Sequence, residues 1–135
     1  MHLGKTEAII FGTKRKLGRV NEFKVNCNNV EIKSVDSVKY LGIKLDNNLS
    51  GESIVSNIIK KAGSRLKFLY RYKDIFNERI RKLTCSALIQ CHFDYCCSSW
   101  YTSINKGLKD KLQIMLNKTI RYILDLDSRS HIGAN

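Results

Sequence analysis

Metal-binding side chains are crowded into one short stretch of the chain. Thiolates and imidazoles are ligands that zinc prefers in proteins, and the stretch contains Cys85, Cys91, His92, Cys96 and Cys97. It has no Cys-x-x-Cys pair, and a single helix would spread these side chains around its axis. The pattern leaves two interpretations open, which are packing of the cysteines in a helical core and a zinc site.

Other catalytic arrangements are not evident in the sequence. Acidic residues are scattered, and no pair of aspartates lies on a predicted strand or turn that could hold two magnesium ions. His2, His92 and His131 lie in contexts that favour no pairing of a nucleophile with a base. We therefore predict no self-contained active site and no metal or other cofactor bound by this chain.

Positively charged side chains outnumber negatively charged ones in this chain. The chain has 24 Lys and Arg against 12 Asp and Glu, a formal charge of +12, and this balance favours phosphate-rich partners. Within one predicted helix, long cationic side chains could contact a phosphate backbone while Tyr70 and Tyr72 contact sugars. A solvated helix face is the alternative interpretation. The candidate phosphate contacts are Lys60, Lys61, Arg65, Lys67 and Arg71.

The hydrophobic period changes near Ser50 from two towards 3.6. Before this point, residues 8–11 predict a short buried strand, and residues 22–25 and 30–35 predict a hairpin around an asparagine-rich turn. Residues 38–45 predict one strand whose apolar face switches sides beside Gly42, as at a bulge. We expect an α+β fold, with a small antiparallel sheet in residues 1–49 and a helical domain in residues 50–135.

Three apolar stripes predict a bundle of three helices in the second part, because none of these helices could bury its apolar face alone. The first helix begins after Ser50, which can cap it. The second begins after Asn77 and runs towards Trp100. The three stripes are Ile54, Val55, Ile58, Ile59, Ala62, Leu66 and Leu69; Ile80, Leu83, Ala87, Leu88 and Cys91; and Leu108, Leu112, Met115, Leu116, Ile120, Ile123 and Leu124.

The beginning of the chain offers only Ala8 to Phe11 as an apolar run. Such a run is far too short for a signal peptide or a membrane span. The odd number of cysteines, without a secretory signal, favours reduced thiols. We expect an intracellular protein of the nucleus or cytoplasm, without a membrane partner.

Several motifs, taken in order, resemble the reverse transcriptases of non-LTR retrotransposons. Residues 4–12, GKTEAIIFG, and residues 38–46, VKYLGIKLD, followed by Leu49 and Ser50, resemble the segment after the catalytic aspartates in that family. The motif HFDY leading to Trp100, together with residues 112–121, is similar to the thumb and its C-terminal extension. The resemblance covers nearly the whole chain.

The resemblance implies that the chain is the end of the palm and the helical thumb of an RNA-directed DNA polymerase. Tyr40, Leu41 and Gly42 would correspond to the primer grip, and the helices would hold the template-primer duplex of RNA and DNA. Lys5 would touch the triphosphate or protonate the leaving pyrophosphate. The fingers, the rest of the palm and the magnesium-binding aspartates would lie before Met1, so the fragment would be inactive alone.

Two other functions stay open on the sequence. The chain could be a stand-alone basic nucleic-acid-binding module, whose helices act without a polymerase, or a helical protein-interaction module. Neutralising the cations of the first helix should abolish nucleic-acid binding in the polymerase fragment and in the stand-alone module, and change little in the interaction module.

Overall fold

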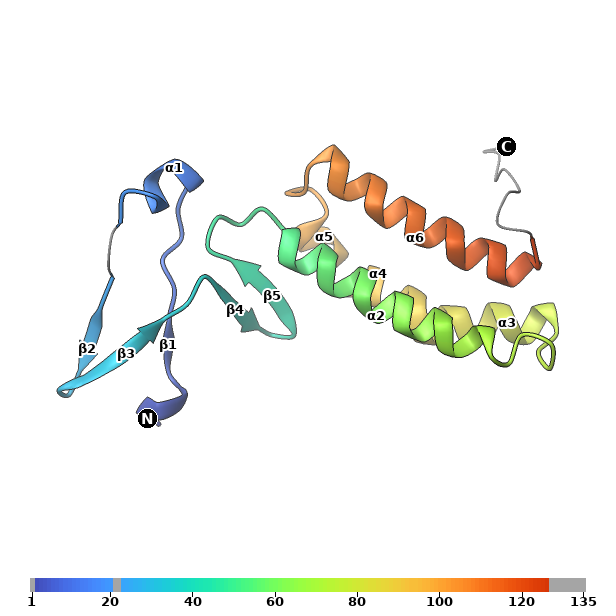
Figure 1. Ribbon diagram of the computed structural model, residues 1–135, viewed down its shortest axis with the longest axis horizontal. Coiled ribbons are helices and arrows are strands. Elements are labelled where there is room, and N and C mark those ends of the chain that lie inside the picture. The colour runs from blue at the N-terminus through green and yellow to red at the C-terminus, as the bar shows by residue number, and fades with distance from the viewer. Residues whose placement is uncertain (1, 21–22, 127–135) are drawn as a thin grey trace. The chain divides into compact units, whose positions relative to one another are not determined.

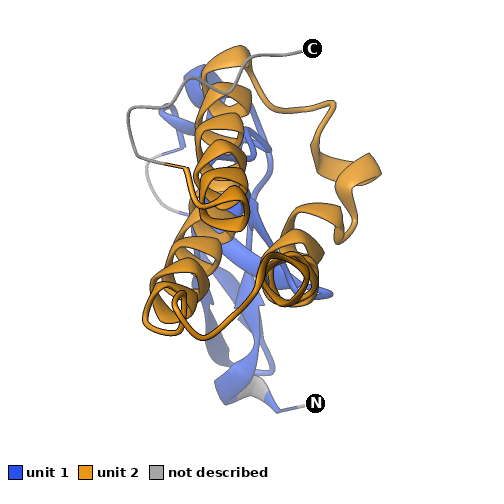
Figure 2. Ribbon diagram, turned by 90° about the vertical axis from the view of Figure 1, so that its right-hand side faces the viewer, with its two compact units in different colours: residues 1–54 blue, residues 55–135 orange. Residues whose placement is uncertain are grey.

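The computed structural model describes residues 2–20 and 23–126, and the chain divides into two compact units (Figure 1; Figure 2). Unit 1, Met1–Ile54, holds the strands, and unit 2, Val55–Asn135, is helical. The predicted α+β class, with a small sheet followed by helices, is confirmed. Residues 127–135 of the predicted helical domain lie outside the described residues.

Unit 1 is built from short strands and buries little. Its first sheet has the order β1-β3-β2, with β1 parallel and β2 antiparallel to β3, while β4 and β5 form a separate antiparallel pair. Among the described residues of this unit, only Ile32 and Ile54 have buried hydrophobic side chains. In chain order the elements are η1 (Leu3–Lys5), β1 (Glu7–Ala8), α1 (Lys14–Leu17), β2 (Val25–Cys27), β3 (Val30–Ser34), β4 (Ser37–Tyr40) and β5 (Ile43–Asp46).

The hairpin of β2 and β3 confirms the predicted hairpin and its second strand, but the first strand lies at Val25–Cys27 and not at residues 22–25. Cys27 pairs with Val30 across a two-residue turn, in which Asn28 and Asn29 have φ of 50° and 61°. Asparagine tolerates these left-handed conformations better than most residues do. The predicted start of this hairpin, at residue 22, lies outside the described residues.

The predicted buried strand at residues 8–11 is wrong in its position. Strand β1 covers only Glu7–Ala8, which pair with Lys33 and Ser34 of β3. Phe11 lies beyond this pairing and is exposed. An apolar run of four residues indicated the strand, but only two residues of this region form backbone hydrogen-bonded pairs with β3.

The prediction of one bulged strand over residues 38–45 is also wrong. The chain turns back at Leu41 and Gly42, so that Tyr40 pairs with Ile43 and Ser37 pairs with Asp46. Both turn residues have positive φ, 47° and 81°, as a two-residue hairpin turn of this kind requires. The switch of the apolar face beside Gly42 therefore marks a reversal of the chain rather than a bulge.

Helix α2 (Glu52–Tyr70) matches the first predicted helix. Its predicted stripe is buried, apart from the half-buried Ile59. The Ser50 hydroxyl accepts the N–H of Glu52 at 3.3 Å, as predicted for a cap, and an oxygen of Asp46 accepts the N–H of Ser53 at 3.0 Å. The start of α2 is thus satisfied by two side chains.

The second predicted helix is divided. It consists of α3 (Glu78–Cys85), a π-helical turn η2 (Ser86–Gln90) and α4 (Cys91–Asp94), and it stops at Cys96, whose φ is 50°. A separate short helix, α5 (Cys97–Trp100), follows, and the Trp100 ring N–H donates to the carbonyl oxygen of Tyr95 at 3.0 Å. The described helical part therefore contains four helical segments, counting α3, η2 and α4 as one, rather than the predicted three.

The predicted stripe of this second helix is mostly exposed. Leu83 is 62% exposed and Ile80 39%, whereas Cys85, Ile89 and Phe93 are 2%, 0% and 6% exposed. The helix therefore packs its other apolar face into the core. The number of apolar residues could not show which of the two faces is buried, because both faces have apolar side chains at helical spacing.

Helix α6 (Lys106–Leu124) completes the unit and packs against α3. The Asn105 side chain accepts the N–H of Leu108 at 2.9 Å and caps its start. Of the predicted stripe, Leu108, Leu112 and Met115 are buried, while Leu124 is exposed. The remaining three, Leu116, Ile120 and Ile123, are half-buried.

Tyr122 joins the far ends of α6 and α2. Its side chain is fully buried, and its hydroxyl donates to the carbonyl oxygen of Leu69 at 3.1 Å. The ring also meets that of Tyr70 edge-on, with 5.0 Å between the centroids. Beside this contact, Lys73 forms an ion pair with Asp125. The Leu69 carbonyl in the last turn of α2 thus has two donors, the Tyr122 hydroxyl and the N–H of Tyr72 at 3.0 Å.

We expect Tyr122→Phe to lower the free energy of unfolding by about 1 kcal/mol, because the Leu69 carbonyl loses one of its two donors while the ring keeps its packing. Urea unfolding followed by far-ultraviolet circular dichroism measures this loss. Tyr70→Phe is the matched control, since Tyr70 is 46% exposed, and it should change stability by less than about 0.5 kcal/mol. An equal loss in both variants would contradict the assigned role of the buried hydroxyl.

Candidate nucleic-acid interface

Two cations of α2 and Arg71, which directly follows it, form a row on the side of the helix away from its buried face. At about 100° per residue, Lys60, Lys67 and Arg71 lie about 150–200° around the axis from the centre of that face. All three are exposed, and Arg71 continues the last turn through its N–H bond to Phe68 at 3.2 Å. We call Lys60, Lys67 and Arg71 the cation row. It extends about 16 Å along the axis.

The other two predicted contacts, Lys61 and Arg65, lie on one flank of the buried face instead. His92 of α4 belongs to the same flank, since its pKa is lowered by burial and then by the charges of Lys61 and Arg65. Sequence reasoning missed this histidine, because only the packing of α4 brings it near α2. Among the described residues, none of the five predicted contacts forms an ion pair within 4.0 Å.

The two tyrosines near the cation row differ in their surroundings. Tyr70 packs on Tyr122, while the ring of Tyr72 lies between those of Phe68 and Phe76, at centroid distances of 5.2 and 6.1 Å. Tyr72 is 39% exposed. Contact of either ring with a sugar stays a prediction, and Tyr70 already has a structural role.

The tip of the β4–β5 hairpin exposes two large apolar side chains. Tyr40 is 63% exposed and Leu41 73%. Leu41 is unfavourable at φ 47°, because its Cβ comes close to a backbone carbonyl there and its side chain cannot form the local hydrogen bonds that make asparagine acceptable. Contact of Tyr40, Leu41 and Gly42 with a primer stays a prediction.

Lys5 ends the short helix η1, where it is exposed. Its N–H donates to the carbonyl oxygen of His2 at 3.1 Å, and the Thr6 hydroxyl donates to the same oxygen at 3.1 Å. These bonds order the backbone around Lys5. The contact of its ammonium group with a triphosphate stays a prediction.

The cysteines are not gathered around a common point. All five are free thiols, with Cys85 buried, Cys91 and Cys96 exposed, and Cys27 and Cys97 half-buried. Within residues 2–20 and 23–126, no group of three or more His, Cys, Asp or Glu side chains is arranged to hold a metal ion. Packing in the core accounts for Cys85.

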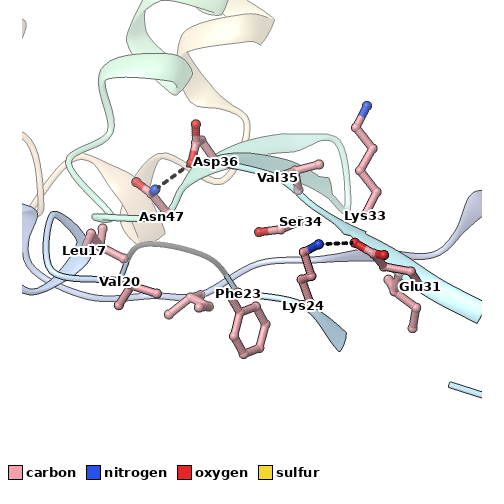
Figure 3. A pocket seen from close by; sticks show the side chains of 12 residues that line it. Leu17, Val20, Phe23, Lys24, Glu31, Lys33, Ser34, Val35, Asp36 and Asn47 are labelled. Carbon is pink, nitrogen blue, oxygen red and sulfur yellow. Dashed lines mark hydrogen bonds and ion pairs between the residues drawn. The ribbon is translucent and has the colours of Figure 1, made fainter. Parts of the chain in front are cut away.

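A hollow of about 500 Å³ lies in unit 1 beside β3 (Figure 3). Its polar wall includes two bonded pairs, Lys24 with Glu31 at 3.6 Å and Asn47 with Asp36 at 3.3 Å. The charges of the wall are mixed, so the hollow does not concentrate one sign of charge. Its apolar wall is formed by Ile10, Leu17, Val20, Phe23, Ile32 and Val35.

Comparison of the chain with protein-family models, with curated proteins and with solved structures found no match. In the described part of the chain, no helix combines the length and the apolar character that crossing a membrane requires.

We expect Leu41→Asn to stabilise the β4–β5 hairpin by about 1 kcal/mol, because Asn-Gly suits a turn with two positive φ angles. Hydrogen exchange of the β4 and β5 amides should slow by about fivefold, while affinity for an RNA–DNA duplex should fall. Leu49→Asn is the control, since Leu49 has φ 53° and is 54% exposed. It should relieve similar strain without loss of affinity, and a similar loss in both variants would count against a contact at the hairpin tip.

Thiol reagents should distinguish the cysteines. Burial raises the pKa of the Cys85 thiol to about 11, so only about one in a thousand of these thiols is ionised at about pH 8. Cys91 and Cys96 should react within minutes, and Cys85 only on unfolding, as peptide mapping of the labelled chain would reveal. Rapid labelling of Cys85 in the folded chain would show that this core position is open.

Proposed function

We propose that the chain binds the phosphate backbone of a nucleic-acid duplex through the cation row of α2. The observation that carries the proposal is the position of Lys60, Lys67 and Arg71 on one exposed side of a helix, with no ion pair to a described carboxylate. Cations without intramolecular partners keep their attraction for a polyanion. Their extent of about 16 Å equals the rise of about five base pairs.

A nucleic acid fits this surface better than an acidic protein does. The positive charges lie at the ends of long flexible side chains on one side of a helix, where they can follow a phosphate backbone. Lys61 and Arg65 add positive charge on a flank of the same helix, beside His92 of α4. A duplex that covers both the row and the flank would also favour the protonated form of His92, because added negative charge opposes the effect of the two cations.

We further propose that the chain serves this role as the end of the palm and the thumb of a reverse transcriptase of the non-LTR kind. This rests on the resemblance of its motifs, with the hairpin tip at Tyr40, Leu41 and Gly42 as the primer contact and Lys5 as the triphosphate contact. The polymerase chemistry and its magnesium ions would belong to fingers and palm residues outside this chain. Such a protein would work inside the cell, in the nucleus or the cytoplasm, where free thiols persist.

Replacing all three residues of the cation row by glutamine should weaken binding to a labelled RNA–DNA duplex of about 20 base pairs. Each lost phosphate contact removes about 0.7–0.9 from the slope of log affinity against log salt, so the slope should decrease in magnitude by about 2–3. Fluorescence anisotropy over a salt series measures both effects. Glutamine keeps most of the length of the side chains and favours the helix.

The control variant changes the same residue types elsewhere. Replacing Lys14, Arg15 and Lys16 of the exposed helix α1 by glutamine removes the same charge. We expect a smaller loss of affinity and a smaller change of slope in this variant. Equal effects in the two variants would mean that total charge alone attracts the duplex, and the proposed surface would then be wrong. Absence of binding by the unmodified chain at low salt would exclude the function itself.

A further inference from the structure

The segment from Leu83 to Phe93 has no Lys, Arg, Asp or Glu, in a chain of which 27% is charged. It covers the end of α3, the π-helical turn η2 and most of α4. A long uncharged stretch is expected where a helix is buried on all sides. Here, however, one side is exposed, with Leu83 at 62%, so this helix presents a surface that differs from the cation row.

The helical segment has two apolar faces rather than one. The inner face is formed by Cys85, Ile89 and Phe93, which are buried. Leu83, Ala87 and Cys91 repeat the same spacing two residues earlier and are exposed, and Ile80, at 39% exposed, widens this outer stripe. In an α-helix, side chains four residues apart are rotated by about 40° around the axis relative to one another. The π-helical turn η2 has more residues per turn, which reduces this rotation, so the residues of each face stay aligned along the helix.

Nucleic acid does not fit the outer stripe, because the stripe offers no cation to a phosphate. The stripe does have the symmetry of a helix that pairs with a copy of itself. The small residue Ala87 stands in its middle, with Leu83 four residues before it and Cys91 four residues after it. In an antiparallel pair with a two-fold axis at Ala87, Leu83 of each copy meets Cys91 of the other.

The charges at the ends of the segment agree with this antiparallel pairing. Arg79 and Asp94 are exposed, stand eight residues before and seven after Ala87, and lie on the same side of Ala87, at about 80° and 20° around the axis on ideal helical spacing. Antiparallel pairing about Ala87 places the arginine of one copy beside the aspartate of the other, twice. Parallel pairing would leave the arginine and the aspartate about 22 Å apart along the axis, so this contact would be lost.

We propose that the outer stripe of α3, η2 and α4 is the contact surface of a two-fold antiparallel homodimer. The proposal concerns a surface separate from the cation row and does not depend on the proposed function. An apolar stripe of four residues per copy is small compared with stable interfaces, so the dimer should be weak, with a dissociation constant in the micromolar range. The two Arg79–Asp94 contacts fix its direction more than its strength.

Sedimentation equilibrium of the full chain, nuclease-treated and under reducing conditions, tests the surface. The unmodified chain should show a monomer–dimer equilibrium, and Leu83→Glu should raise the dissociation constant by at least about tenfold. Ile114→Glu is the matched control, because Ile114 of α6 is another exposed residue, at 56%, and its replacement should leave the equilibrium unchanged. Because both positions are exposed, the variants should fold, as circular dichroism can verify.

Charge reversal tests the direction of pairing. Arg79→Glu and Asp94→Lys should each weaken the dimer by a few-fold, and the double variant should restore the affinity of the unmodified chain. A chain that stays monomeric at all concentrations up to about 1 mM, the upper end of the micromolar range, would overturn the proposal. So would a Leu83→Glu variant that dimerises like the unmodified chain, an Ile114→Glu variant that does not, or a double variant no better than the single ones.

Discussion

Burial of the apolar face of α2 is the constraint on which the rest of the helical unit depends. Val55, Ala62 and Leu69 are at most 1% exposed, and burying a side chain of the size of leucine or valine contributes about 1.5–3 kcal/mol. Because the helix repeats every 3.6 residues, this face determines which residues point to solvent. Lys60 and Lys67 point outward for this reason, and no ion pair with a carboxylate of residues 2–20 or 23–126 holds them there.

The same reasoning explains why α2 and its cation row could be predicted from the sequence, whereas the exposed face of α3 could not. Helix α2 has a single apolar stripe, so the buried side and the cationic side follow from one another. The next helix has two apolar stripes, led by Leu83 and Cys85. Periodicity alone cannot choose between them, and the π-helical turn has no clear sequence signal. Only packing against α6 selects Cys85 for the core.

The two hairpins show how far turn chemistry can be read from a sequence. Asn28 and Asn29 suit positive φ angles, so the first hairpin was predictable. Leu41 does not suit them, and residues 38–45 were predicted as one strand because the local rule was broken at that residue. Leucine at a position with positive φ gives no signal for a turn, so the reversal of the chain there could not be predicted from the sequence.

Within the helical unit, the cation row and the outer stripe are chemically unlike and belong to different helices. Each lies opposite a face buried in the same core, so a duplex bound to α2 does not have to cover the stripe on α3 and α4. Two paired chains would then carry two cation rows, which only a nucleic acid long enough to span the dimer could contact together. Once the first row is bound, the second binds at a raised effective concentration if the duplex spans both rows. A weak dimer of this kind would strengthen binding to long duplexes more than to short ones, without any new contact to nucleic acid.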